Sequence, residues 1–263
     1  MTSLTAPPAG TGSRAVDRIS RCCVIGSGGR MGGLFVARLR KAVIETAGLD
    51  QPLEAPLLAE VLPSQDLVLL AVPAPAMEEV LVKCAPHCRP DAILVDICSV
   101  KVQPLRLMLQ YHPGPVVGTH PLFGQDPGEA PRVAVVPGRD DQATQTVSSV
   151  LEDLGFQTFP TTAETHDRAM AAIQGLNFVT TAAYLAALAG DDGLRDFLTP
   201  SFERRLEAAR KMLTEDAALF ADLFEANPYS QDAVRQFRSH LNIAAGGDVD
   251  VLAQRAGWWW RSS

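Results

Sequence analysis

Five of the eight residues from 26 to 33, in the segment GSGGRMGG, are glycines. So bare a backbone lets a phosphate approach the main-chain N–H groups at the start of a helix, which is how many proteins bind nucleotides. The same composition would also suit a close strand–helix contact without any ligand. The segment follows the apolar run CCVI and opens the amphipathic stretch RMGGLFVARLRK. This strand–turn–helix setting favours nucleotide binding.

The glycines fit the dinucleotide fingerprint G-x-G-x-x-G imperfectly in either register. Beginning the motif at Gly26 puts Met31 in its last position, whereas beginning it at Ser27 puts a serine in its first. An acid about 20 residues further on should bind the adenosine ribose, and we prefer Asp50 to Glu45 because it closes the segment AVIETAGLD. Such a carboxylate repels a 2′-phosphate, so we predict NAD rather than NADP. The predicted cofactor-binding residues are Gly26, Gly28, Gly29, Arg30, Met31, Gly32, Asp50, Val72 and Pro73.

Two further polar segments follow apolar runs that resemble strands. Ser99 and Lys101 come after VDIC, and His120 comes after VVGT and before a proline. Ligands gather at the carboxyl ends of strands in open α/β sheets, where a neutral histidine can accept a proton. A buried structural histidine would give the same pattern.

Short apolar runs that alternate with helical patterns must form the elements that position these groups. The runs CCVIG, DLVLLAVP, AILVDIC, VVGTH and RVAVVPG are followed by turn or helix signals, and several are apolar throughout, like strands buried on both faces. The alternation predicts a parallel sheet with helices on both faces. We assign a Rossmann-type, doubly wound α/β domain that binds NAD to residues 20–160.

Beyond the last of these runs, Ala, Leu, Glu, Arg and Gln recur at helical spacing. Thr161 and Glu164 have the spacing of a capping box, and Thr199 before Pro200 is typical of a second helix start. We therefore predict an all-α helical domain over residues 161–263. Its last segment, GWWWRSS, should pack against this domain or a second subunit.

The charge balance narrows the range of partners. The chain has 23 Lys and Arg against 30 Asp and Glu, a net charge of −7. This balance argues against nucleic acid or an anionic membrane surface as a partner. No run of 18 apolar residues occurs, so we expect no membrane-spanning segment. Residues 1–19, rich in Pro, Gly, Ser and Thr, are typical of a disordered tail.

The five cysteines show no spacing typical of a secreted disulfide framework, which favours a reducing, cytoplasmic location. Cys84, His87 and Cys88 are close enough to suggest a metal site, but no second ligand pair follows at a suitable spacing. We therefore predict no metal.

The segment CSVKVQPLRLMLQYHPGPVVGTHPLFGQD, residues 98–126, resembles the corresponding part of the prephenate dehydrogenase family. The resemblance is strongest to the dehydrogenase part of bifunctional chorismate mutase/prephenate dehydrogenases. It extends through GSGGRMGGLF, HDRAMAAIQGLNF and TEDAALFADL over most of residues 20–225. It implies NAD-dependent oxidative decarboxylation of a cyclohexadienyl dicarboxylate to an arylpyruvate, and a homodimer joined through the helical domain. Prephenate and 4-amino-4-deoxyprephenate, the latter used in antibiotic pathways, are the two candidate substrates.

The resemblance also implies roles for individual residues. His120 matches the family's catalytic histidine, and His112 matches a histidine associated with the nicotinamide cofactor. Ser99 and Lys101 fall on the family's SVK at the active-site edge, where we expect Ser99 to assist catalysis and Lys101 to contact substrate. The remaining predicted substrate-binding residues are His166, Gln174, Phe178, Arg204 and Arg205.

Two positions depart from the family pattern. Phe178 stands where the resemblance leads us to expect a histidine, which would suit a changed C4 substituent on the substrate or a loss of tyrosine feedback. Glu203 stands where we expect an arginine for a substrate carboxylate. Arg204 and Arg205 are the available substitutes, and Arg205 lies nearer the apolar stripe of its helix. A solvated basic patch is the alternative explanation of this pair.

Other functions remain open at this point. A non-catalytic sensor would bind a dinucleotide without turnover. A β-hydroxyacid or imine reductase would share the two-domain layout, but the lysine expected of such an enzyme does not stand out in HDRAMAAIQGLNF. The alanine-rich stretch TTAAYLAALAG would allow close helix packing between subunits, or equally within one chain.

Overall fold

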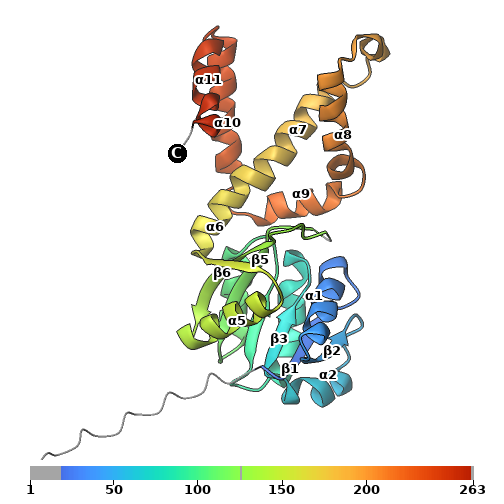
Figure 1. The fold of residues 1–263 in the computed structure, drawn as a ribbon, viewed down its shortest axis with the longest axis vertical. Coiled ribbons are helices and arrows are strands. Elements are labelled where there is room, and N and C mark those ends of the chain that lie inside the picture. Colours follow the sequence, from blue (N-terminus) through green and yellow to red (C-terminus); the bar gives the residue numbers. More distant parts are fainter. Residues whose placement is uncertain (1–18, 125, 262–263) are drawn as a thin grey trace, which may run out of the picture.

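The computed structural model describes residues 19–124 and 126–261. The predicted disordered tail therefore lies outside the described residues, apart from residue 19. An α/β part is followed by a set of helices that extend away from it (Figure 1). The predicted fold class, a Rossmann-type sheet followed by helices, is confirmed.

Seven strands form one sheet in the order β2-β1-β3-β4-β5-β6-β7. They are β1 Arg21–Ile25, β2 Glu45–Leu49, β3 Leu67–Leu70, β4 Ile93–Asp96, β5 Val116–Pro121, β6 Arg132–Arg139 and β7 Gln157–Pro160. Neighbouring strands are parallel except β5 and β6, which are antiparallel. The predicted all-parallel sheet is wrong at this pair, because the short link after β5 holds no crossover helix.

Helices cover both faces of the sheet and bury its apolar side chains. They are α1 Arg30–Lys41, α2 Ala55–Val61, α3 Met77–Cys84, α4 Val102–Tyr111 and α5 Asp141–Asp153. One core cluster includes Ile25 and Leu81, and another includes Val24 and Phe35. Alternate residues of β1 thus enter different clusters, as expected for a strand covered on both faces.

The helical part begins directly after β7. Its elements are α6 Ala163–Met170, a π-helical turn Ala171–Gly175, α7 Leu176–Ala186, α8 Pro200–Thr214, α9 Ala217–Ala226, α10 Ser230–Ala245 and α11 Val249–Ala256. The predicted cap at Thr161 is wrong by one residue, because the hydroxyl of Thr162 accepts the hydrogen bond from the Thr165 N–H. The predicted cap at Thr199 is confirmed by its bond from the Phe202 N–H.

The continuous helix Ala163–Ala186 is long and apolar enough, by length and composition alone, to cross a membrane. Its most apolar window has a mean hydropathy of 1.2 and is 17% buried. The sequence analysis found no such segment because small and polar residues interrupt the apolar run. The helix begins with buried His166 and Asp167, which face the α/β part, as in a helix of a globular protein.

The carboxyl ends of the strands face the helical part. Figure 1 shows α9 lying across this edge, while α7, α8, α10 and α11 point away. His120 lies near the end of β5, and Ser99 follows β4. The fold therefore brings the polar residues that follow separate strands toward one face, where the helices close over them.

Candidate active site

A cavity of about 370 Å³ lies between the two parts of the chain. From the α/β part its lining includes Arg30, Met31, Ser99 and His120. From the helical part it includes Gln174, Lys211, Asp216, Leu219 and Phe220. Five of the predicted site residues are thus brought together, namely Arg30, Met31, Ser99, His120 and Gln174.

The glycine turn has the geometry of a nucleotide cradle. Gly26 has φ +87°, and a Cβ there would lie 2.4 Å from the Ala71 carbonyl oxygen. A Cβ on Gly32 would lie 2.0 Å from the Gly26 carbonyl oxygen. The motif therefore begins at Gly26, and Gly32 rather than Met31 provides the close helix–strand contact.

The start of α1 offers free donors next to the cavity. The helix begins at Arg30 with Gly29 as its N-cap, and within the described part of the chain no side chain caps it. Because the first N–H groups of a helix have no partner within the helix, they can bind an anion. Arg30 and Met31 both line the cavity, so a dinucleotide pyrophosphate fits at this end.

Asp50 follows β2, the strand beside β1. Its carboxylate accepts hydrogen bonds from the Ser27 hydroxyl at 2.5 Å and from the Gly28 N–H at 2.9 Å. Val72 follows β3 and lies against the turn, because a Cβ on Gly26 would be 3.3 Å from its Cγ1. Pro73 is the next residue, and it is exposed. A carboxylate in this position suits the ribose hydroxyls of a dinucleotide.

His120 is buried and lines the cavity. Its Nδ1 lies 2.8 Å from Nε2 of His166. Burial, and then the neighbouring His166 and Lys101, hold the pKa of His120 well below its ordinary value of 6.5. The imidazole is therefore neutral at pH 7, and Nε2 is the ring nitrogen left for the cavity. A neutral imidazole can act as a general base.

His166 was predicted to bind substrate, but the structure places it behind His120 and not in the cavity lining. It is buried, and its Nδ1 lies 2.7 Å from Oδ1 of Asp167. The Asp167 carboxylate accepts hydrogen bonds from the Lys101 N–H at 2.7 Å and the Val102 N–H at 2.8 Å, at the start of α4. The chain His120–His166–Asp167 thus runs from the cavity into the protein.

Lys101 was also predicted to contact substrate, and the structure places it elsewhere. Its side chain is 0% exposed, forms an ion pair with Asp96 and donates to the Thr119 carbonyl oxygen at 2.7 Å. Asp96 was missed by the sequence analysis, although an acid at the end of an apolar strand was a visible signal. A buried cation requires such a partner, so the side chain turns inward.

His112 was predicted to contact the cofactor, and this is wrong in the structure. It follows α4, is buried, and its Nε2 lies 2.8 Å from the Ala92 carbonyl oxygen, just before β4. Because α4 runs back along the sheet, its carboxyl end returns the chain to the edge opposite His120.

Neither Arg204 nor Arg205 lines the cavity. Both are exposed on α8, and the Arg205 guanidinium lies 4.0 Å from the centre of the Tyr184 ring. Lys211, nearer the carboxyl end of the same helix, does line the cavity. The sequence analysis missed it because it looked for an arginine at one aligned position.

The aromatic side of the cavity comes from α7 and α9. The Phe178 ring stacks on Phe220, with ring centres 5.6 Å apart and planes at 18°. Phe220 lines the cavity, so Phe178 supports it from behind. Gln174 lies in the π-helical turn, whose extra residue shifts it from the position that regular α-helical spacing would give it.

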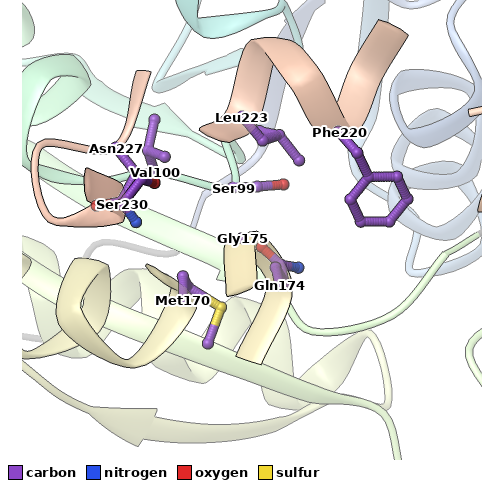
Figure 2. A pocket seen from close by; sticks show the side chains of 9 residues that line it. All are labelled: Ser99, Val100, Met170, Gln174, Gly175, Phe220, Leu223, Asn227 and Ser230. Carbon is purple, nitrogen blue, oxygen red and sulfur yellow. The ribbon is translucent and has the colours of Figure 1, made fainter. Parts of the chain in front are cut away.

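A second, small cavity of about 10 Å³ extends the site toward α10. Figure 2 shows Ser99 and Gln174 at its lining together with Ser230 and Asn227. The Ser230 hydroxyl is buried and has no hydrogen-bond partner among the described residues. The volume and polar lining suit one water molecule. It shares four lining residues with the larger cavity, namely Ser99, Gln174, Phe220 and Leu223.

Comparisons with known proteins agree on one family. A sequence model described as "Prephenate dehydrogenase, nucleotide-binding domain" matches residues 45–156. The T-protein of Enterobacter agglomerans is 31% identical over 227 residues, which is 84% of this chain and 60% of that protein. The chain thus spans about 60% of that relative's length. The 4-amino-4-deoxyprephenate dehydrogenase of Streptomyces pristinaespiralis is 27% identical over 254 residues, covering 88% of this chain and 85% of that protein.

The fold is also that of a solved structure. The prephenate dehydrogenase of A. aeolicus, in complex with hydroxyphenyl propionate and NAD+, superposes with a TM-score of 0.71 at 20% identity. The match covers 90% of this chain and 95% of that one. The predicted cofactor, NAD, agrees with the nucleotide-binding description of the matched domain and with the geometry of the glycine turn.

Proposed function

We propose that this chain is a member of the prephenate dehydrogenase family and that it catalyses the NAD-dependent oxidative decarboxylation of a cyclohexadienyl dicarboxylate to an arylpyruvate. One observation carries the proposal: a buried, neutral His120 and the uncapped start of α1 border the same cavity. One group can accept a proton there, and the other can bind a pyrophosphate. The five free thiols fit a reducing cytoplasm.

The groups around the cavity have separate roles in the proposed reaction. The N–H groups at the start of α1 would hold the pyrophosphate of NAD, and Asp50 would hold a ribose. The chemistry that this cofactor would supply is a hydride acceptor for C4 of the ring. Nε2 of His120 accepts the proton of the C4 substituent, with the Ser99 hydroxyl beside it in the same lining. Loss of CO2 from C1 then makes the ring aromatic, and the C4 oxygen or nitrogen takes the proton back from Nε2 of His120.

A substrate with two carboxylates needs cationic partners. Arg30 and Lys211 are the cationic side chains of the lining, one from each part of the chain. Arg30 is already paired with Asp216 at 2.9 Å. Lys211 is therefore our candidate for holding a substrate carboxylate, in place of Arg204 and Arg205.

The identity of the C4 substituent decides between two substrates. Prephenate carries a hydroxyl there, and 4-amino-4-deoxyprephenate carries an amine. The apolar Phe178–Phe220 pair, and the similarity along nearly the whole chain to a 4-amino-4-deoxyprephenate dehydrogenase, favour the amine. The overall reaction is the same for both.

The experiment is a comparison of kcat/KM for the two substrates with purified protein and NAD. A higher value for the amino analogue supports the assignment. A value for prephenate that is at least as high removes the amine as the natural substituent. NAD binding without turnover of either substrate would instead indicate the non-catalytic sensor and overturn the proposed function.

We further propose that the protein is a homodimer joined through the helical part. In α7, α9 and α11 no residue is fully buried in the single chain. The apolar side chains that remain exposed include Phe197, Trp258, Trp259 and Trp260. Apolar surface of this extent is typical of a subunit interface.

A further inference from the structure

We propose that Asp167 and His166 fix the tautomer of His120, so that its Nε2 presents a lone pair to the cavity. The catalytic meaning of this inference rests on the proposed function. The tautomer itself is a property of the protein without substrate, so the two can be tested separately.

Asp167, the buried end of the hydrogen-bonded series, determines which atom donates and which accepts in each of its bonds. Asp167 is 0% exposed, and its carboxylate accepts N–H bonds from Lys101 and Val102 at 2.7 and 2.8 Å. These N–H groups start α4, where the helix dipole favours a negative charge. Backbone N–H groups can only donate, so the carboxylate must remain an acceptor.

The acceptor role of Asp167 then determines which nitrogen carries the proton, first in His166 and then in His120. Oδ1 of Asp167 accepts from Nδ1 of His166 at 2.7 Å, so that nitrogen carries the proton. In a neutral imidazole the other nitrogen, Nε2, is an acceptor. It lies 2.8 Å from Nδ1 of His120, which must therefore donate. Nε2 of His120 is left without a proton.

The hydrogen-bonded series His120–His166–Asp167 can also move the positive charge away from His120 after it accepts a proton. When Nε2 of His120 takes the proton from the substrate, the proton on Nδ1 of His120 can pass to Nε2 of His166. His120 is then neutral again, and His166 becomes an imidazolium beside the Asp167 carboxylate. A positive charge is less costly there than on buried His120 alone, because its counter-charge lies within hydrogen-bond distance.

A purely structural role for Asp167 is the alternative, since it caps α4 and its backbone carbonyl accepts from the Asn227 amide at 2.7 Å. Two replacements separate the roles. In Asp167→Asn the amide oxygen can keep the position of Oδ1, which accepts from both the Lys101 N–H and Nδ1 of His166, so the tautomer should be retained. Asp167→Leu removes the acceptor, so Nδ1 of His166 is no longer held as a donor and the proton of His120 is no longer confined to Nδ1.

The direct measurement is ¹⁵N NMR of the imidazole nitrogens in the full chain, above pH 7. In the wild-type protein and in Asp167→Asn we expect the proton on Nδ1 of His120, and in Asp167→Leu we expect a substantial share of it on Nε2. A proton on Nε2 in the wild type overturns the inference, whether or not the variants fold. An unchanged tautomer in folded Asp167→Leu also overturns it.

Kinetics give a second readout. Asp167→Leu should lower kcat by about 10²–10⁴ with little change in KM, the size seen when an acid that orients a catalytic histidine is replaced. Glu164→Leu is the matched control, a similar change at an exposed position of the same helix, and it should leave kcat unchanged. If the spectra are as expected but neither substrate is turned over, the proposed function fails and the tautomer assignment stands. Full kcat in folded Asp167→Leu would overturn the inference.

Discussion

The α/β part completes its core within one chain, whereas the helical part does not. In the α/β part, both faces of the sheet are covered, and Phe35 and Leu81 are at most 1% exposed. In the helical part, Phe197 and Trp260 are 80% and 81% exposed. Buried apolar area is the main source of folding stability, so the helical part needs a second surface, for which we propose a second copy.

The same division separates the proposed chemistry. His120, Ser99 and the glycine turn belong to the α/β part, while Lys211 and Phe220 reach the cavity from the helices. Substitutions in the α/β part should therefore affect folding and turnover. Substitutions in the helical part should affect association and substrate affinity, except at His166 and Asp167 of α6, which act on turnover through His120.

The free energy of unfolding should show the largest difference between substitutions in the two parts of the chain. Phe35→Ala removes a buried ring and should lower the free energy of unfolding by about 3–5 kcal/mol, whereas Phe197→Ala should change that of the dissociated chain by no more than about 0.5 kcal/mol. Urea unfolding at a concentration low enough to dissociate the dimer measures both values. For Phe197→Ala, sedimentation at decreasing concentration should show a weaker dimer. Equal losses of stability would contradict the contrast.

Two cationic residues of α8, Lys211 and Arg204, should differ in their effect on substrate affinity. Lys211→Met removes a charged partner of a carboxylate, worth about 1.5–3 kcal/mol, and should raise KM roughly tenfold to a hundredfold with kcat nearly unchanged. Arg204→Met, on the same helix but away from the cavity, is the control and should leave KM unchanged. The opposite result would restore Arg204 to the site and remove Lys211 from it.

The free energy of unfolding should also depend on pH, through buried histidines of the α/β part. This effect should be smaller than those of the substitutions above. Burial lowers the pKa of both His112 and His120 below 6.5. Below that value the unfolded chain binds protons that the folded chain does not, so the free energy of unfolding should fall as the pH drops. Each histidine contributes at most about 1.4 kcal/mol per pH unit.

Urea unfolding from pH 7 to pH 5 measures this slope. The window lies above the range in which most carboxylates titrate, so histidines dominate it. His112→Gln should reduce the slope, because it removes a histidine that is buried and neutral in the folded chain. Stability that stays flat or rises on acidification would contradict the burial of neutral histidines.

The sequence predicted the elements better than the directions of side chains. Apolar runs followed by polar residues located β4, β5 and His120, because strand ends in a parallel sheet meet at one edge. The same reasoning could not show that Lys101 turns inward to Asp96, or that α4 returns His112 to the opposite edge. A pattern of residue types carries no information on which neighbour a side chain meets.

The helical side of the site was the hardest to predict. Lys211 and Phe220 reach the cavity that His120 lines only because the chain returns along α8 to α9, which lies across the sheet edge. The π-helical turn also displaces Gln174 from the ideal helical spacing. These residues lie far from His120 in the sequence, and no local motif marked them.

The catalytic role of His120 is tested most directly by the rate of NADH formation in His120→Asn, with NAD and either substrate at saturation. Asparagine keeps a polar group but removes the base, so kcat should fall by about 10²–10⁴ while the circular dichroism spectrum is unchanged. A folded variant with a rate close to that of the wild type would contradict proton transfer to His120.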